Sequence, residues 1–169
     1  MKSTDKGAPL AEHRQALREL EQLCSTLRTL VLATSLGDQP HCSLMSFAFG
    51  EDKRSFVLVT PKGTRKYENI QGNGRASTLL TEAGGSEPQE AGGLTATING
   101  HIAVLRQEER LRAVDGFVRK YPRLREFAES PDSAVLRLAW EEAVLVRGIH
   151  SVIRLDLARE GLAEGRNSP

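Results

Sequence analysis

Hydrophobic residues recur at helical spacing in two parts of the chain. In residues 9–27 leucines follow one another at three- or four-residue steps among charged residues, with a proline in the first turn. In residues 107–121 apolar positions again keep this spacing, and Pro122 ends the pattern. We therefore predict two amphipathic helices, and a further short helix over residues 124–128.

Between and after these helices the pattern changes to that of short strands. Residues 29–35 and 42–49 flank turn residues at 36–40, which predicts a hairpin, and residues 55–60 form a strand buried on both faces. Residues 94–105 alternate most cleanly between apolar and polar positions. Further strands are expected at 76–81 and, as two or three pieces, near 134–140, 143–147 and 152–157. Residues 83–93 are expected to form a long mobile loop, because they hold four glycines and a proline.

About seven short strands with few helices between them favour a barrel with added helices over a sheet of βαβ units. The predicted class is mainly β with helices, α+β. A short helix capped by Thr64 is expected to follow the third strand. The expected organisation is an N-terminal helix at 1–28, a barrel domain at 29–157 and a polar tail at 158–169.

Composition narrows the range of functions. The 169 residues are 39% hydrophobic, which suits one domain with a real core. The 23 Lys and Arg nearly cancel the 22 Asp and Glu, so no overall field favours nucleic acid or an anionic membrane. Two cysteines and no apolar run of about 20 residues lead us to expect a cytoplasmic protein that does not cross a membrane.

Residues 60–66 concentrate the groups that bind an anion. Lys62, Arg65 and Lys66 lie around Thr64 at the start of the predicted short helix. An anion bound there would meet unpaired backbone N–H groups, the positive end of a helix dipole and an arginine. The alternative is a solvated, charged helix start. Neither a P-loop nor a Rossmann glycine pattern occurs elsewhere in the chain.

Several segments in fixed order resemble one family. They are GDQPHCSLMSF (37–47), FVLVT (56–60), TRKYENI (64–70), GRAS (74–77) and LTATINGHI (94–102). Together these segments resemble the pyridoxamine-phosphate-oxidase-like superfamily over residues 29–157. The resemblance implies a split β-barrel of antiparallel Greek-key type that binds flavin mononucleotide (FMN).

The resemblance also implies which residues hold the flavin. Backbone N–H and C=O groups of the segment Ser43, Leu44, Met45 and Ser46 are expected along the flavin ring, although Met45 could equally fill the core. Thr60 matches a threonine that the family has at the end of the third strand, and Thr64, Arg65 and Lys66 match the family's phosphate clamp. A homodimer with the flavin at the subunit interface is expected.

Two departures from the family pattern bear on function. True pyridoxamine-phosphate oxidases have basic residues where this chain has Ser43 and Ala48, and their C-terminal segment for the substrate phosphate has no match here, so oxidation of vitamin B6 is not expected. The segments FVRKYP (117–122) and LVRGIH (145–150) are instead similar to the haem-utilisation branch, which makes Arg147 and Gly148 candidates to reach a flavin. The alternative for Arg147 is a surface arginine at a strand end.

No catalytic side chain or metal site is predicted, because no two of the four histidines have metal-ligand spacing. The leading hypothesis is an FMN-dependent oxidoreductase acting on an unidentified small molecule, with the flavin carrying the chemistry. The alternatives are a flavin-binding or electron-transfer module without turnover, a haem-binding or haem-utilisation protein, and a deazaflavin cofactor in place of FMN.

Overall fold

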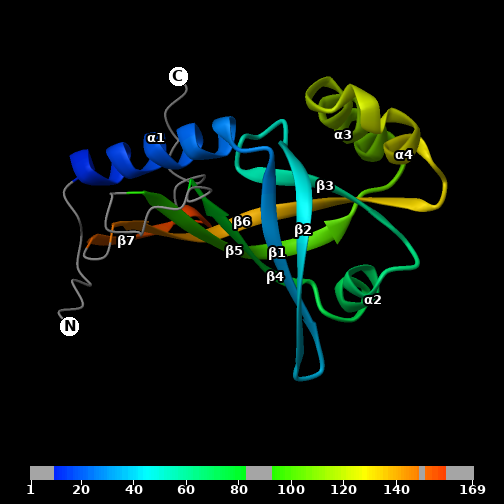
Figure 1. Cartoon of the computed structure of the whole chain (residues 1–169), viewed down its shortest axis with the longest axis horizontal. Coiled ribbons are helices and arrows are strands. Elements are labelled where there is room, and N and C mark those ends of the chain that lie inside the picture. Colours follow the sequence, from blue (N-terminus) through cyan, green and yellow to red (C-terminus); the bar gives the residue numbers. More distant parts are fainter. Residues whose placement is uncertain (1–9, 83–92, 149–150, 159–169) are drawn as a thin grey trace, which may run out of the picture.

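Seven antiparallel strands form one sheet that closes on itself in the computed structural model, which describes residues 10–82, 93–148 and 151–158 (Figure 1). The expected loop at 83–93 and the tail at 158–169 fall almost entirely outside these ranges. The strands are β1 (Thr29–Leu36), β2 (Gln39–Phe49), β3 (Ser55–Pro61), β4 (Arg75–Thr81), β5 (Leu94–Val104), β6 (Ser133–Arg147) and β7 (Ser151–Asp156). Their order is β3-β2-β1-β4-β5-β6-β7, and β3 also pairs with β6. Six strands therefore make a barrel, and β7 extends the sheet beyond β6. The predicted fold class is confirmed.

The barrel interior is the main hydrophobic core. Alternate residues of each strand point inward, among them Leu32, Phe47, Leu58, Ile98 and Leu136, all with 0% exposure. Helix α1 (Leu10–Thr26) adds Ala16, Leu20, Leu23 and Cys24 to the same cluster. The leucine spacing noticed in the sequence is thus the face that α1 turns towards the barrel.

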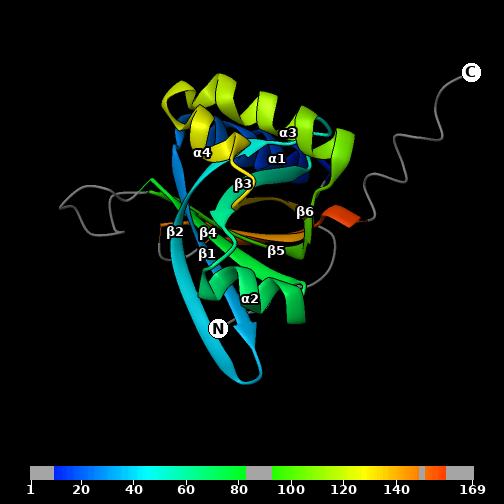
Figure 2. The same cartoon turned by 90° about the vertical axis from the view of Figure 1, so that its right-hand side faces the viewer.

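A second core lies outside the barrel, under the two helices at the upper right of Figure 1 and at the top of Figure 2. Helix α3 (Gln107–Lys120) and the short α4 (Arg125–Glu129) are joined by a 3-10 turn at Pro122–Leu124. Val114, Phe117 and Val118 of α3 pack on the outward side chains of β3, Val57 and Val59. This explains why β3 is buried on both faces, as its continuous apolar run predicts.

Of the two or three strands expected over residues 134–157, the structure has two. Residues 134–147 form a single strand, and the apparent break at Glu141 and Glu142 is a bulge within it. Gly100 of β5 pairs with Trp140 and Asn99 pairs with Glu142, which leaves Glu141 without a partner on β5. A bulge keeps the strand paired on both sides of the extra residue, so two adjacent charged residues do not require a turn.

Gly100 is required at this bulge, because a side chain there would strike backbone. A Cβ added to Gly100 would lie 1.9 Å from the carbonyl oxygen of Ala139. We expect Gly100→Ala to lower the free energy of unfolding by about 3 kcal/mol, the upper end of the usual cost of overpacking. Urea denaturation measures this loss. Gly63→Ala is the matched control, because a Cβ at Gly63 meets no atom within 4 Å, and equal effects of the two changes would refute the assignment.

Candidate functional site: an open barrel edge beside two unpaired cations

The barrel is open between β2 and β3. These strands pair only from Phe47 to Phe49, opposite Leu58 to Phe56, although β2 extends back to Gln39. The N–H of Gly50 donates to the carbonyl of Ser55 in β3. Because backbone groups alternate sides along a strand, those of Ser46 and Leu44 face the same way, beyond the last paired residues. Among the described residues no strand pairs with β2 on this side before Phe47, so its backbone donors and acceptors are available there to a ligand.

This geometry divides the four predicted residues of β2 into two pairs. Ser46 and Leu44 direct their backbone polar groups to the open edge. Ser43 and Met45 direct theirs towards β1, where they pair in register with Leu32 and Leu30. The side chain of Met45 is only 7% exposed and belongs to the barrel core, so core filling accounts for it.

Helix α2 (Arg65–Gly72) begins just beyond the end of β3, as expected, but Thr64 does not cap it through its side chain. The Thr64 hydroxyl donates to the carbonyl of Pro61 at 2.9 Å and lies 3.2 Å from the hydroxyl of Thr60. The Thr64 hydroxyl therefore bonds to the Pro61 carbonyl and not to a backbone N–H group of the helix. The first N–H groups of α2 are left for another acceptor.

Arg65 and Lys66 lie at the start of α2. Among the residues that the structure describes, no carboxylate lies within ion-pair distance of either, whereas arginines at 75, 112, 119, 125, 137, 147 and 154 each have one. Burial lowers the pKa of Lys66, which is partly enclosed. Lys62, the third cation of the segment, donates instead to the carbonyl of Pro131 at 2.7 Å. Two of the three predicted cations are therefore available to an anion.

Arg147 and Gly148 lie far from α2 within one chain. Ser133, at the other end of β6, pairs with Pro61, and roughly 45 Å of strand separates it from Arg147. The Nε of Arg147 donates to Glu19 of α1 at 2.7 Å, and the N–H of Gly148 donates to Gly93. Within one chain this pair therefore does not reach the start of α2.

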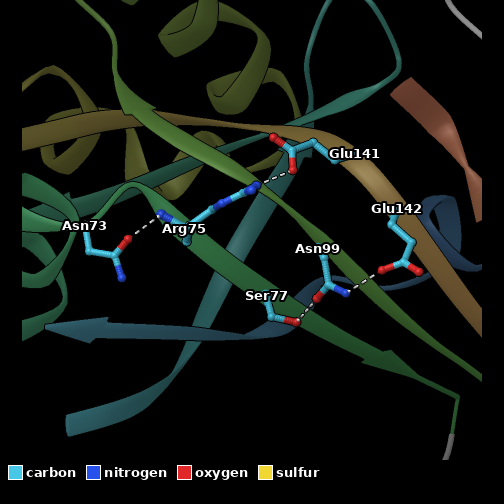
Figure 3. Close-up of polar contacts among 6 residues, drawn as sticks. All are labelled: Asn73, Arg75, Ser77, Asn99, Glu141 and Glu142. Atoms are coloured by element: carbon cyan, nitrogen blue, oxygen red, sulfur yellow. Dashed lines mark hydrogen bonds and ion pairs between the residues drawn. The ribbon is translucent and has the colours of Figure 1, made fainter. Parts of the chain in front are cut away.

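A polar groove that the sequence did not reveal lies on the outer face of β4, β5 and β6 (Figure 3). Ser77 donates to Asn99 at 2.7 Å, Asn99 donates to Glu142 at 3.1 Å, and Arg75 pairs with Glu141. These residues line a cavity of about 550 Å³. These side chains come together because the three strands pair in this register and the bulge turns Glu141 outward beside Glu142. In the sequence, the two adjacent glutamates in an apolar strand were the only signal of this groove.

Two negative findings apply to the described ranges 10–82, 93–148 and 151–158. None of the helices there has the length and apolar character needed to cross a bilayer. No group of three or more His, Cys, Asp or Glu side chains gathers there to hold a metal ion.

Solved structures share this fold at low sequence identity. A haem binding protein from Mycobacterium smegmatis is 16% identical, with a TM-score of 0.73 over 89% of this chain and 60% of that one. Campylobacter jejuni ChuZ is 13% identical, with a TM-score of 0.74 over 92% and 63%. The haem storage protein HutZ from Vibrio cholerae is 19% identical, with a TM-score of 0.62 over 78% and 94%.

This chain thus spans less than two thirds of the first two proteins, and these likenesses establish the fold. No curated protein matches the chain in sequence. The family model of pyridoxamine 5'-phosphate oxidase matches residues 16–147, which is most of the chain and includes the open edge, α2 and the bulged strand. The chain therefore belongs to the pyridoxamine 5'-phosphate oxidase family.

Proposed function

We propose that the chain is an FMN-binding flavoprotein that acts as an FMN-dependent oxidoreductase on a small molecule. One observation carries the proposal: Arg65 and Lys66, which have no ion-pair partner among the described residues, lie at a helix start that follows β3, and β2 is unpaired on its β3 side before Phe47. A phosphate fits the first feature, and a planar heterocycle with hydrogen-bonding edges fits the second. Proteins of this family commonly bind flavin, which supports the same assignment.

In this proposal each group of the site has a distinct task. Arg65, Lys66 and the first N–H groups of α2 hold the phosphate. The backbone groups of Ser46 and Leu44 bind the edge of the ring and fix its orientation. Buried Thr60 keeps the loop before α2 in place through its contact with Thr64. The bound flavin supplies the hydride and electron transfer, and the protein orients it and excludes water.

Titration of the flavin-free protein with FMN tests this proposal, because flavin fluorescence changes when the ring is enclosed. We expect one FMN per chain, and weaker binding of riboflavin, which lacks the phosphate. Substrate-dependent reduction of the bound flavin then separates an oxidoreductase from a module that only binds or carries electrons. Failure to bind either compound would exclude the flavin site.

A haem-binding function is the second candidate, because two of the similar structures are described as haem proteins. Haem binding requires a side chain that can serve as an axial ligand of the iron, and histidine is the candidate residue type here. His41 lies 3.2 Å from the Ser43 hydroxyl at the end of the open edge, and His101 is exposed on β5, while His150 lies outside the described ranges. Titration with haem decides the matter, since an unshifted Soret band would remove this candidate.

We further propose a homodimer formed through an outward apolar row on the barrel. Leu44 and Leu79 are 71% and 41% exposed, and both pair in register with Val31 of the strand between them. Proteins of this family are often dimeric, and burying such a row against a second copy would remove apolar surface from water.

We expect Leu79→Glu to shift the protein from dimer to monomer and to weaken FMN binding, because a charge at the interface opposes association. Light scattering at micromolar concentration measures the mass. Leu111→Glu is the control, since Leu111 is 66% exposed on α3 and away from this row. A monomeric wild-type protein with flavin bound would contradict the proposal.

A further inference from the structure

The end of the barrel at the turn between β2 and β3 buries two hydrogen-bond donors that have no acceptor in the chain. One is the indole Nε1 of Trp140 in β6, a residue that is only 5% exposed. The other is the guanidinium nitrogen Nη1 of Arg54, the residue just before β3. A buried donor without an acceptor costs free energy, and in folded proteins such groups are normally paired with protein, water or an ion. Two such donors at one end of the barrel therefore point to a bound acceptor.

The two donors belong to residues that lie opposite each other. The backbone N–H of Trp140 donates to the carbonyl of Arg54 at 3.0 Å, which continues the β3–β6 ladder by one residue pair beyond Ser55. Directly opposite residues in such a pair have Cα atoms about 5.5 Å apart and side chains on the same face of the sheet. Here that face is the barrel interior, because Trp140 and Phe56 both belong to the main core. The guanidinium and the indole therefore lie at the same end of the interior.

Aromatic rings surround this end of the barrel. The centre of the Trp140 ring lies 4.8 Å from that of Phe56, in an edge-to-face arrangement, and 6.1 Å from that of Phe49. The edge of an aromatic ring carries partial positive charge, so ring edges favour an anion beside them over a cation. The rings also take up most of the space at this end, so a bound acceptor has to be small.

No carboxylate of the described ranges neutralises the guanidinium of Arg54. Asp52 accepts hydrogen bonds from the backbone N–H of Arg54 at 2.9 Å and from the Ser55 hydroxyl at 2.7 Å, and its carboxylate is not paired with the guanidinium. Glu51 pairs with Arg112 instead. An arginine keeps its charge at any ordinary pH, and an uncompensated charge beside an apolar core is unfavourable. An acceptor that satisfies both donors is therefore expected to carry negative charge.

We propose that this end of the barrel binds one small monovalent anion, such as chloride, between the guanidinium of Arg54 and the indole N–H of Trp140. The anion would join β3 to β6 at the seam where the barrel closes. The proposal does not depend on the flavin assignment, because neither residue belongs to the segment Ser43–Ser46, to Thr60 or to the start of α2.

Trp140 is the only tryptophan of the chain, so its fluorescence reports directly on this site. Iodide is the probe, because it is a monovalent halide that quenches tryptophan on contact. At constant ionic strength, kept with gluconate, we expect a saturable loss of fluorescence with iodide, and chloride should compete with it. The lifetime of the remaining emission should stay constant, since each quenched chain holds a bound ion. Quenching that does not saturate, or that chloride does not relieve, would show that the donors are hydrated and would overturn the proposal.

Three variants assign the binding to Arg54. Arg54→Met keeps the length of the side chain without its charge, and should weaken iodide and chloride at least about tenfold, since a charge-assisted contact is lost. Arg54→Lys keeps the charge without the guanidinium fork, and should bind chloride more weakly than the native chain but better than Arg54→Met. Lys53→Asn is the matched control, because it removes one cation from the adjacent residue, and asparagine tolerates the φ of 53° found there. It should leave both affinities unchanged.

Acrylamide, a neutral quencher, shows whether the variants keep Trp140 buried, and its quenching should stay as low as in the native chain. If Arg54→Met exposes the indole, Arg54→Lys carries the test by its chloride affinity. FMN affinity, measured on the same samples, should be equal in all variants, which separates this proposal from the flavin assignment. Chloride affinity equal to that of the native chain in either Arg54 variant, or an equal loss in Lys53→Asn, would overturn the proposal.

Discussion

Replacing Arg65 and Lys66 together by alanine is expected to weaken FMN binding by about 3 kcal/mol, or about a hundredfold. Each cation would contribute a charge-assisted hydrogen bond worth about 1.5–3 kcal/mol, and we take the lower value because Arg65 is exposed to solvent. Neither side chain has an ion-pair partner among the described residues to lose, so the stability of the protein should change little. Calorimetric titration with FMN measures the difference.

Two controls locate this effect at the phosphate. Riboflavin should bind the native protein and the double variant equally, because it has no phosphate to lose. Lys62→Ala should leave FMN affinity close to that of the native protein, since the Lys62 ammonium is already engaged by the Pro131 carbonyl. An unchanged dissociation constant for FMN in the double variant would move the phosphate site elsewhere.

The FMN-loaded protein is expected to oxidise pyridoxamine phosphate slower than a dedicated oxidase by orders of magnitude. A phosphorylated substrate needs an anion site of its own, because a second phosphate beside that of FMN would be repelled. Dedicated oxidases resemble this chain but have basic residues at the positions of Ser43 and Ala48. Here Ala48 is 4% exposed under α3 and pairs with Val57, so no cation projects from this position.

Each charge-assisted contact that is lost weakens binding of the transition state by about 1.5–3 kcal/mol. These free energies add, so the factors by which the rate falls multiply. The assay is formation of pyridoxal phosphate in air, with a dedicated oxidase run in parallel. Comparable turnover would show that another cation of this chain, such as Arg147 from a second copy, holds the substrate phosphate.

Elements whose signal is local could be predicted from the sequence. Helix α1, strand β5 and helix α3 follow from the spacing of their apolar residues, because each buries one face. The continuity of β6 could not be predicted in this way. Glu141 and Glu142 look like a turn in the sequence, and only pairing with Asn99 and Gly100 of β5 shows that they form a bulge.

The candidate site was predictable in part for the same reason. Arg65 and Lys66 are adjacent in sequence at a helix start, so their clustering is visible before folding. The ladder from Ser77 through Asn99 to Glu142 depends on the register of three strands far apart in the chain. Which carbonyls face the open edge of β2 likewise depends on where its pairing with β3 stops.

The most direct test of the FMN assignment is the identity of the cofactor that the purified protein carries. We expect the absorption spectrum of an oxidised flavin and, after denaturation, release of a compound with the mass of FMN, about one per chain when the protein is saturated. A Soret band with release of haem, or failure of the protein to take up added FMN, would contradict the account.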